Sequence, residues 1–245
     1  MQGLAVHPAK PGRGPGRGSG FCAEVQGSPL FAALSAEQSA AILGEAVLLR
    51  CTGGDMLFLQ GDEPHFLHII LKGEIGLFGT LSDGEETLVN ILRAPEIFIA
   101  AAVLAGKPYL MSARALGPAR VLAMPAERLC RNLRAMPELA VAMVGAMSTH
   151  FRSLVREVKN LKLKSSTQRL ALYLLSLTPK LAGPVVAWLP HSKRLIAARV
   201  GIRPETLSRT FNALREHGVQ VTGTKVTIAD VAALAAFCQH GEDLI

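Results

Sequence analysis

Short apolar segments separated by turn residues fill residues 47–124, and this pattern constrains the fold more than any other feature of the chain. Turn-forming sequences stand at residues 61–64, 72–73 and 82–84, with β-branched and aromatic residues between them. Turn signals at intervals of about 8–12 residues are typical of small antiparallel barrels and sandwiches. We therefore predict a β-rich N-terminal half, except for the alanine-rich residues 97–104, which are expected to form a short helix.

The C-terminal half of the chain has a helical pattern, and residues 137–164 are expected to form one long helix with Pro137 in its first turn. Its apolar residues recur at alternating intervals of three and four, the spacing of a coiled-coil seam. They are Val144, Met147, Phe151, Leu154, Val158 and Leu161. The opposite face carries Arg152, Arg156 and Lys159, so the apolar row is narrow. This row either packs against the helix's own domain or pairs with a second copy of the chain.

Two capping-box sequences predict helix starts before and after this long helix. Ser35 is followed by Gln38, and Ser165 is followed by Gln168. In such a box the serine and glutamine side chains each accept a hydrogen bond from the other residue's backbone N–H. We expect one helix to end near residue 45 and another to cover residues 169–177, followed by a loop up to residue 190.

Residues 192–228 contain two short helical patterns separated by a glycine. The first pattern ends before Gly201, which allows a tight turn, and the second begins near Arg203 with Pro204 in its first position. Helix, glycine turn and helix within about 20 residues is the helix-turn-helix arrangement. The alternating segment around residues 222–225 is then expected to form a hairpin wing.

The residues expected to face outward at the start of the second helix are Arg203, Glu205, Thr206, Ser208 and Arg209. An arginine there can donate two hydrogen bonds to guanine O6 and N7, and a carboxylate can accept one from a cytosine or adenine amino group. The alternative is an ordinary exposed ion pair between Glu205 and Arg209, which stand four residues apart. The turn, the wing and the surrounding basic residues favour DNA contact. We also assign Lys193 and Lys225 to the DNA-binding surface.

The net charge of +7 is unevenly distributed along the chain. Residues 151–220 hold 13 Lys and Arg against three Asp and Glu, a surplus of 10, so the other 175 residues sum to −3. A basic block in a nearly neutral chain indicates a polyanionic partner, either nucleic acid or an anionic membrane surface. The block lacks a contiguous cluster of about 4–8 Lys and Arg of the kind that anchors proteins to membranes. We therefore favour double-stranded DNA and expect no membrane association.

Other classes of protein are excluded by the sequence. The longest apolar run, residues 97–106, is shorter than the roughly 20 residues of a membrane-spanning helix. Residues 1–27 have no apolar signal-peptide core and are expected to form a flexible basic tail. No nucleophile elbow, phosphate-binding loop, paired carboxylates or zinc motif is present, so we expect no enzyme. The cysteines form no CxxC pair, which predicts neither a metal site nor a disulfide, and favours the cytoplasm. They are Cys22, Cys51, Cys130 and Cys238.

The motifs resemble those of the CRP/FNR superfamily of bacterial transcription regulators over about residues 28–235. Glu205-Thr-Leu-Ser-Arg209 matches the family's E-T-x-S-R recognition-helix motif, and residues 61–78 resemble its β-roll signature. The resemblance implies an α+β chain with three parts: an N-terminal antiparallel β-roll sensor of the cyclic-nucleotide-binding, jelly-roll type (28–136), a dimerisation helix (137–164) and a winged helix-turn-helix (165–245). It also implies a homodimer, which favours pairing of the apolar row, and RNA polymerase as a partner.

The same resemblance implies a DNA target. Glu205, Ser208 and Arg209 match the FNR type of reading residues, because the CRP type would need an arginine where Pro204 stands. The implied target is an inverted repeat similar to TTGAT-N4-ATCAA, with one recognition helix on each half-site. A palindromic site matches the two-fold symmetry of a dimer.

Departures from the family pattern argue against two effectors. Cyclic-nucleotide binders of the family carry a Gly-Glu segment and an Arg-Ser or Arg-Thr pair, and residues 97–113 contain neither. The second position reads Tyr109-Leu-Met-Ser112, and Leu154-Val155 replaces the adenine-contacting pair, so we expect no cyclic AMP. A cyclic phosphate buried without a countercharge would be costly. Because Cys22 is the only cysteine near the N-terminus, we expect no iron–sulfur cluster either.

The sequences LKSSTQRLALYLLSL and IRPETLSR are similar to the DNR/NnrR-type branch of nitric-oxide and redox regulators. This resemblance implies haem in an apolar β-roll pocket. The candidate pocket residues are His68, Tyr109, His150, Leu154 and Val155. His7 and His65 are further candidates for an axial ligand, and each histidine has the alternative of a surface or packing role. Another small ligand and cysteine redox chemistry stay open as effectors, and a basic interaction module that does not bind DNA is the alternative to a regulator.

Overall fold

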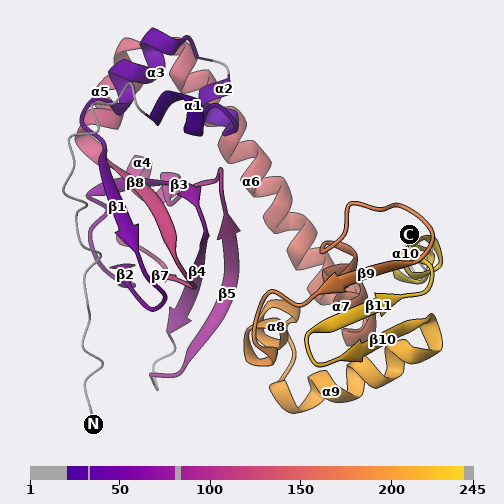
Figure 1. The fold of residues 1–245 in the computed structure, drawn as a ribbon. Coiled ribbons are helices and arrows are strands. Elements are labelled where there is room, and N and C mark those ends of the chain that lie inside the picture. The colour runs from indigo at the N-terminus through magenta and orange to yellow at the C-terminus, as the bar shows by residue number, and fades with distance from the viewer. Residues whose placement is uncertain (1–20, 33, 81–83, 240–245) are drawn as a thin grey trace. The chain divides into compact units, whose positions relative to one another are not determined.

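The computed structural model describes residues 21–32, 34–80 and 84–239. Contacts within the chain divide it into two compact units, Met1–Phe151 and Arg152–Ile245. The first unit holds the antiparallel sheets and the second holds the helix-turn-helix, as the sequence predicts (Figure 1).

The first unit contains two antiparallel sheets of four strands each within its described residues. Their orders are β1-β8-β3-β6 and β2-β7-β4-β5. The strand bounds are β1 (Val47–Cys51), β2 (Met56–Phe58), β3 (Phe66–Lys72), β4 (Glu74–Thr80), β5 (Glu86–Arg93), β6 (Ile97–Phe98), β7 (Ser112–Ala115) and β8 (Ala119–Pro125). The predicted β-roll is therefore confirmed.

Strand β3 lies between two apolar clusters, which explains why its sequence is almost continuously apolar. Leu67 and Ile69 point to one face of the sheet and pack in a cluster with the helices of the unit. Ile70 points to the other face and packs in a second cluster, with Ile75 and Leu77 of β4. Because successive side chains of a strand alternate between faces, a strand covered on both sides is apolar throughout.

The helices of the first unit cover one face of the β3–β8 sheet. They are α1 (Cys22–Val25), α2 (Pro29–Ala32), α3 (Ala36–Leu43), α4 (Ala100–Ala105) and α5 (Ala126–Ala135). The capping box at Ser35 is formed, with both of its hydrogen bonds in place. The short helix α4 begins at Ala100 rather than at residue 97, because Ile97 and Phe98 pair with β3 as strand β6.

The expectation that residues 1–27 form a flexible tail is wrong for the last residues of that range. Phe21 and Val25 are buried in the apolar cluster of the first unit. Glu24 also accepts two hydrogen bonds from the Arg120 guanidinium of β8, at 2.7 and 3.1 Å. Alpha helix α1 is thus part of the folded unit, and residues 1–20 lie outside the described residues.

One glycine is required where β3 turns into β4. Gly73 has φ of 87°, a left-handed conformation that favours glycine. A Cβ atom at this position would stand 2.4 Å from the carbonyl oxygen of Pro118. The predicted Lys72-Gly73 turn therefore also allows β8 to pass close to the hairpin.

The long helix α6 (Pro137–Leu163) begins in the first unit and continues into the second. Its start is held by Leu139 and Met143, which are buried in the apolar cluster of the first unit. The expected helix over residues 137–164 is present with its predicted N-terminus.

The second unit is built from α7 (Ser166–Leu175), α8 (Lys193–Val200), α9 (Pro204–Ala213), the 3-10 helix η2 (Leu214–His217) and α10 (Val231–Gln239). A three-stranded sheet of order β10-β11-β9 joins them, with β9 (Val185–Trp188), β10 (Val219–Thr222) and β11 (Lys225–Ile228). The second capping box, at Ser165, is formed. Strand β9 lies where a loop over residues 178–190 is expected, and it pairs with β11.

Candidate nucleic-acid interface and effector pocket

The two helices of the helix-turn-helix are held by a shared apolar core. Its members from α8 and α9 are Ile196, Ala197, Val200, Leu207 and Phe211. Gly201 between the helices has φ of 71°, and Pro204 occupies the first turn of α9. Glycine adopts this left-handed conformation without strain, and proline at that position loses no helical hydrogen bond. The predicted helix-turn-helix is therefore confirmed in its local geometry.

Helix α9 presents a polar face at its N-terminal end. Arg203, Glu205, Ser208 and Arg209 are exposed, whereas Thr206 is half-buried. Glu205 and Arg209 form no ion pair or hydrogen bond with each other or with any other side chain in the described part of the chain. The alternative of a mutual surface ion pair is thus not realised among the described residues.

Lys193 and Lys225 lie on two other elements of the same unit. Lys193 is the first residue of α8, and Lys225 opens β11 after the turn at Gly223, whose φ is 62°. Both lysines are exposed. The β10–β11 hairpin is the predicted wing, and its register pairs Thr222 with Lys225.

Five of the six residues of the apolar row on α6 are exposed in the single chain. Their exposed fractions are 64% for Val144, 67% for Phe151, 54% for Leu154, 50% for Val158 and 50% for Leu161. Met147 is half-buried and packs against the core of the first unit. Leu161 has a neighbour of its own, because a Cβ atom at Gly201 would stand 2.8 Å from its Cδ2 atom. Apart from Met147 and part of Leu161, the side chains of this row are therefore not covered by other described residues of the chain.

Two of the predicted effector residues, His68 and Tyr109, belong to one aromatic cluster. The Phe58 ring lies 5.2 Å from the His68 ring and 3.9 Å from the Tyr109 ring, centre to centre. His68 is 3% exposed, and burial lowers its pKa to about 4. Its Nδ1 atom is buried and has no hydrogen-bond partner among the residues that the structure describes. Burial also raises the pKa of Tyr109, whose hydroxyl donates a hydrogen bond to the Phe66 carbonyl at 3.2 Å.

The third predicted histidine, His150, is engaged elsewhere in the first unit. Its Nε2 atom lies 3.2 Å from Glu96 Oε1. This hydrogen bond raises the pKa of His150, against the opposing effect of partial burial. Its position on α6 therefore joins that helix to the segment before β6.

The structure brings together two of the five predicted effector residues, and the predicted pocket stays a prediction. His68 and Tyr109 fill the interior between the sheets with Phe58, whereas His150 pairs with Glu96. Leu154 and Val155 belong to the second unit and are exposed. His68 and Tyr109 thus share the ring cluster of Phe58, whereas His150 has a different partner within the first unit.

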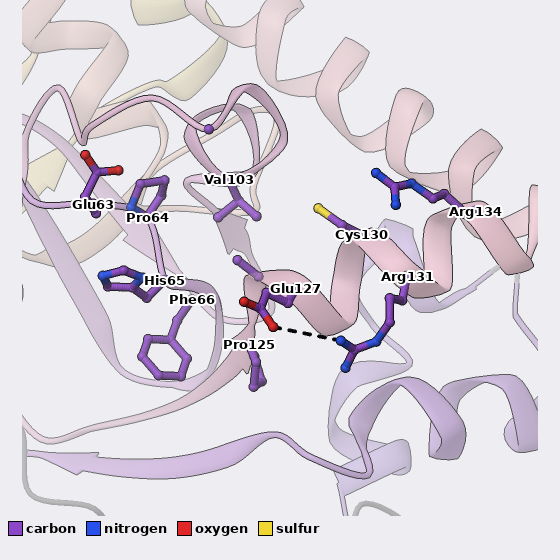
Figure 2. Close-up of a pocket in the computed structure, with 12 residues that line it drawn as sticks. Glu63, Pro64, His65, Phe66, Val103, Pro125, Glu127, Cys130, Arg131 and Arg134 are labelled. Atoms are coloured by element: carbon purple, nitrogen blue, oxygen red, sulfur yellow. Dashed lines mark ion pairs between the residues drawn. The ribbon is translucent and has the colours of Figure 1, made fainter.

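An open pocket of about 730 Å³ lies elsewhere in the first unit, between the start of β3, α4 and α5 (Figure 2). Its apolar lining comes from Pro64, Phe66, Val103, Pro125 and Ala126. Its polar part comes from Glu63, His65, Glu127, Cys130, Arg131 and Arg134. Figure 2 shows the ion pair between Glu127 and Arg131, whose atoms lie 3.9 Å apart. Ligand pockets of about 300–1,000 Å³ with an apolar lining and a few polar groups are typical of small-molecule sites.

The structure describes the side chains of three cysteines, and two of them are buried. Burial raises the pKa of Cys51 and of Cys238 to about 11, which disfavours the reactive thiolate. Cys130 is half-buried and lines the open pocket. Over the described ranges, no three His, Cys, Asp or Glu side chains gather to hold a metal ion. No helix in that part of the chain has the length and apolar character needed to cross a membrane.

The two units together define a class of protein, a β-roll domain joined to a DNA-binding winged helix. A family model described as a cyclic nucleotide-binding domain matches residues 48–134. A model described as a Crp-like helix-turn-helix domain matches residues 168–237. The chain belongs to the CRP/FNR family of transcription regulators, and it is a DNA-binding regulator rather than an enzyme.

Relatives and solved structures extend the likeness over most of the chain. The cyclic AMP receptor protein of Thermus thermophilus is 29% identical over 86% of this chain and 96% of the relative. The transcriptional activator protein FnrA of Stutzerimonas stutzeri is 26% identical over 78% of this chain and 80% of the relative. The crystal structure of a putative cyclic nucleotide binding protein from Ruegeria pomeroyi is 32% identical, with a TM-score of 0.62, and covers 89% of this chain and 96% of that chain.

Proposed function

We propose that the chain binds an inverted repeat similar to TTGAT-N4-ATCAA as a homodimer. The observation that carries this proposal is the polar start of α9, where Glu205, Ser208 and Arg209 are exposed and the two charged residues are unpaired within the described residues. Arginine suits guanine and carboxylate suits cytosine or adenine in the major groove. Arg203 and Thr206 flank these residues, and exposed Lys193 and Lys225 suit phosphates. Such a regulator would act in the cytoplasm with RNA polymerase.

Substitution of Arg209 tests base reading directly. Arg209→Ala should weaken binding to the inverted repeat by about 1–3 kcal/mol and relax selection at one guanine per half-site. Fluorescence anisotropy on a panel of single-base variants would measure both effects. Arg156→Ala, which removes an exposed arginine of α6, should leave base selection unchanged. An equal loss on scrambled DNA would show that Arg209 contacts only phosphate.

The proposed dimer uses the exposed apolar row of α6. Large apolar side chains at half or more exposure, repeated over five positions of one helix, are unusual on a monomer surface. Their alternating spacing of three and four residues suits the packing of two helices side by side. The family relationship supports the same arrangement, because regulators with this helix-turn-helix act as dimers.

We propose further that the effector is an apolar anion other than cyclic AMP, with haem as the candidate, and that it enters the open pocket of the first unit. His65 is the candidate axial ligand that lines this pocket, and Arg134 would pair with a carboxylate of a porphyrin, whereas Arg131 already lies 3.9 Å from Glu127. Phe66 and Val103 would contact its apolar face. When bound, haem would supply an iron centre able to take nitric oxide. In the region where cyclic-nucleotide binders carry their phosphate-binding arginine, Arg114 is already paired with Glu86 at 3.2 Å.

A haemin titration tests the effector proposal separately from DNA binding. We expect a saturable visible spectrum at one haem per subunit that shifts when the reduced protein meets nitric oxide. His65→Ala should abolish this spectrum, whereas His68→Ala should leave it in place, because His68 lies within the aromatic cluster. Cyclic AMP, titrated in parallel by calorimetry, should give no saturable heat. A featureless, non-saturating haemin spectrum would remove haem while leaving the DNA assignment intact.

A further inference from the structure

Arg169, near the start of α7, holds the ends of two other helices at once. Its Nε atom donates to the Val200 carbonyl at 2.8 Å, and one terminal nitrogen donates to the Gly201 carbonyl at 3.1 Å. The other terminal nitrogen donates to the Lys164 carbonyl at 2.8 Å. Val200 and Gly201 form the C-terminal end of α8, whereas Lys164 directly follows α6.

The chemistry of helix ends explains why a guanidinium suits this position. The last carbonyl groups of a helix lack partners within the helix and carry the negative end of its dipole. Arginine presents several N–H donors in a rigid planar fork, whereas lysine presents a single ammonium group. Arg169 can therefore satisfy carbonyls of both helix ends and hold them in one relative orientation.

Two further contacts join the same two elements. Arg199 of α8 forms an ion pair with Glu157 of α6. Leu161 of α6 approaches Gly201 so closely that a side chain there would collide with it. All of these residues lie in the second unit, together with α9 and with Leu154 and Val158 of the apolar row. The last turns of α6 and the helix-turn-helix are thus connected at three points.

We propose that Arg169 is a positioning residue that sets the orientation of α9 relative to the apolar row of α6. It would thereby set the spacing between half-sites that the dimer accepts. In a dimer paired through α6, the distance between the two copies of α9 depends on how each α9 is held relative to the apolar row of its own chain. If the connection between α6 and the helix-turn-helix is loosened, that distance can vary. The loss of affinity for repeats of the wrong spacing should then be smaller. This inference rests on the proposed recognition of an inverted repeat by a homodimer.

The test compares repeats of TTGAT and ATCAA separated by three, four, five and six base pairs. Wild-type protein should prefer four. Arg169→Met, which keeps the apolar stem and loses the donors, should reduce the preference for four over five by about tenfold, since hydrogen bonds to charged groups are lost. Arg169→Lys should lose part of the preference. Arg156→Met removes the same charge from an exposed site on α6, so it should weaken all four repeats alike and keep the preference.

Hydrogen exchange of the backbone amides in residues 196–202 gives a readout that needs neither DNA nor a dimer. Exchange should be faster in Arg169→Met than in wild-type protein or Arg156→Met. Arg169→Lys, which keeps a cation at the site, carries both comparisons if Arg169→Met fails to fold. An unchanged spacing preference in a variant that binds DNA, or unchanged exchange, would overturn the role of Arg169. A wild-type protein that prefers no repeat over scrambled DNA would overturn the proposed function instead, and exchange would then decide the role of Arg169.

Discussion

His68 shows how one buried residue can set the response of the chain to acid. Burial lowers its pKa from 6.5 to about 4, so the folded chain binds this proton less readily than the unfolded chain. Between these two values the unfolded state holds more protons, and the free energy of unfolding falls as the pH falls. From pH 7.5 to pH 5 this residue should cost about 2 kcal/mol.

The measurement is urea unfolding of wild-type protein and His68→Leu at both pH values. The difference in free energy of unfolding between the two proteins should shift by about 2 kcal/mol in favour of the variant at pH 5. Phe31→Leu is the matched control, because Phe31 is fully buried in the other apolar cluster of the first unit and does not titrate. Its effect should be equal at the two pH values. A pH-independent difference for His68→Leu would show that the imidazole does not titrate in this range.

At the same scale, the sequence predicts which residues of α9 are exposed better than it predicts the surroundings of the histidines. The exposure of Glu205, Ser208 and Arg209 follows from helical periodicity, because the buried Leu207 and Phe211 determine which face is free. The partners of His68 and His150 come from distant parts of the chain. No local pattern places Phe58 or Glu96 beside them, so their packing and pairing roles emerge only with the tertiary structure.

At the scale of elements, local chemistry predicts where helices begin but not every strand. Ser35 and Ser165 cap α3 and α7 as expected, because a capping box is complete within four residues. Strand β9 lies in a segment with glycine and proline, and it exists through its pairing with β11, about 40 residues later in the chain. The short helix α1 is stabilised by Phe21 and Val25 in a distant core, which sequence periodicity over so few residues does not reveal.

The exposed apolar row of α6 leads us to predict how a charge placed on it would affect dimerisation. Phe151→Glu places a charge at a residue that is 67% exposed in the single chain, so the fold should survive. In the paired helices the same glutamate would be buried without a partner and should prevent association. Analytical ultracentrifugation should therefore show monomers, with little affinity left for the inverted repeat. The circular dichroism spectrum should stay close to that of the wild type.

Arg152→Glu provides the control for this element. It introduces the same glutamate on the neighbouring, exposed position of the polar face, outside the apolar row. This variant should remain dimeric, although its affinity for DNA should fall with the loss of positive charge. Dimers of unchanged stability in Phe151→Glu would remove the apolar row from the interface.

For the whole molecule, the sequence predicts the order of the two units and the location of the charge, but not the open pocket. The surplus of positive charge between residues 151 and 220 falls entirely within the second unit. The pocket is lined by residues that lie up to about 70 positions apart, from Glu63 to Arg134. Such a pocket depends on how β3, α4 and α5 pack, and that arrangement has no sequence signature.

This charge distribution predicts how salt acts on DNA binding. The logarithm of the affinity should fall linearly with the logarithm of salt concentration, with a slope proportional to the number of phosphates contacted. Lys225→Gln would remove two lysines from a dimer, so the slope should decrease by roughly 2 and the affinity should fall alike on all sequences. Lys72→Gln, at an exposed site of the first unit, is the control and should leave the slope unchanged. Anisotropy titrations at several salt concentrations measure both slopes, and an unaltered slope in Lys225→Gln would remove the wing from the phosphate contacts.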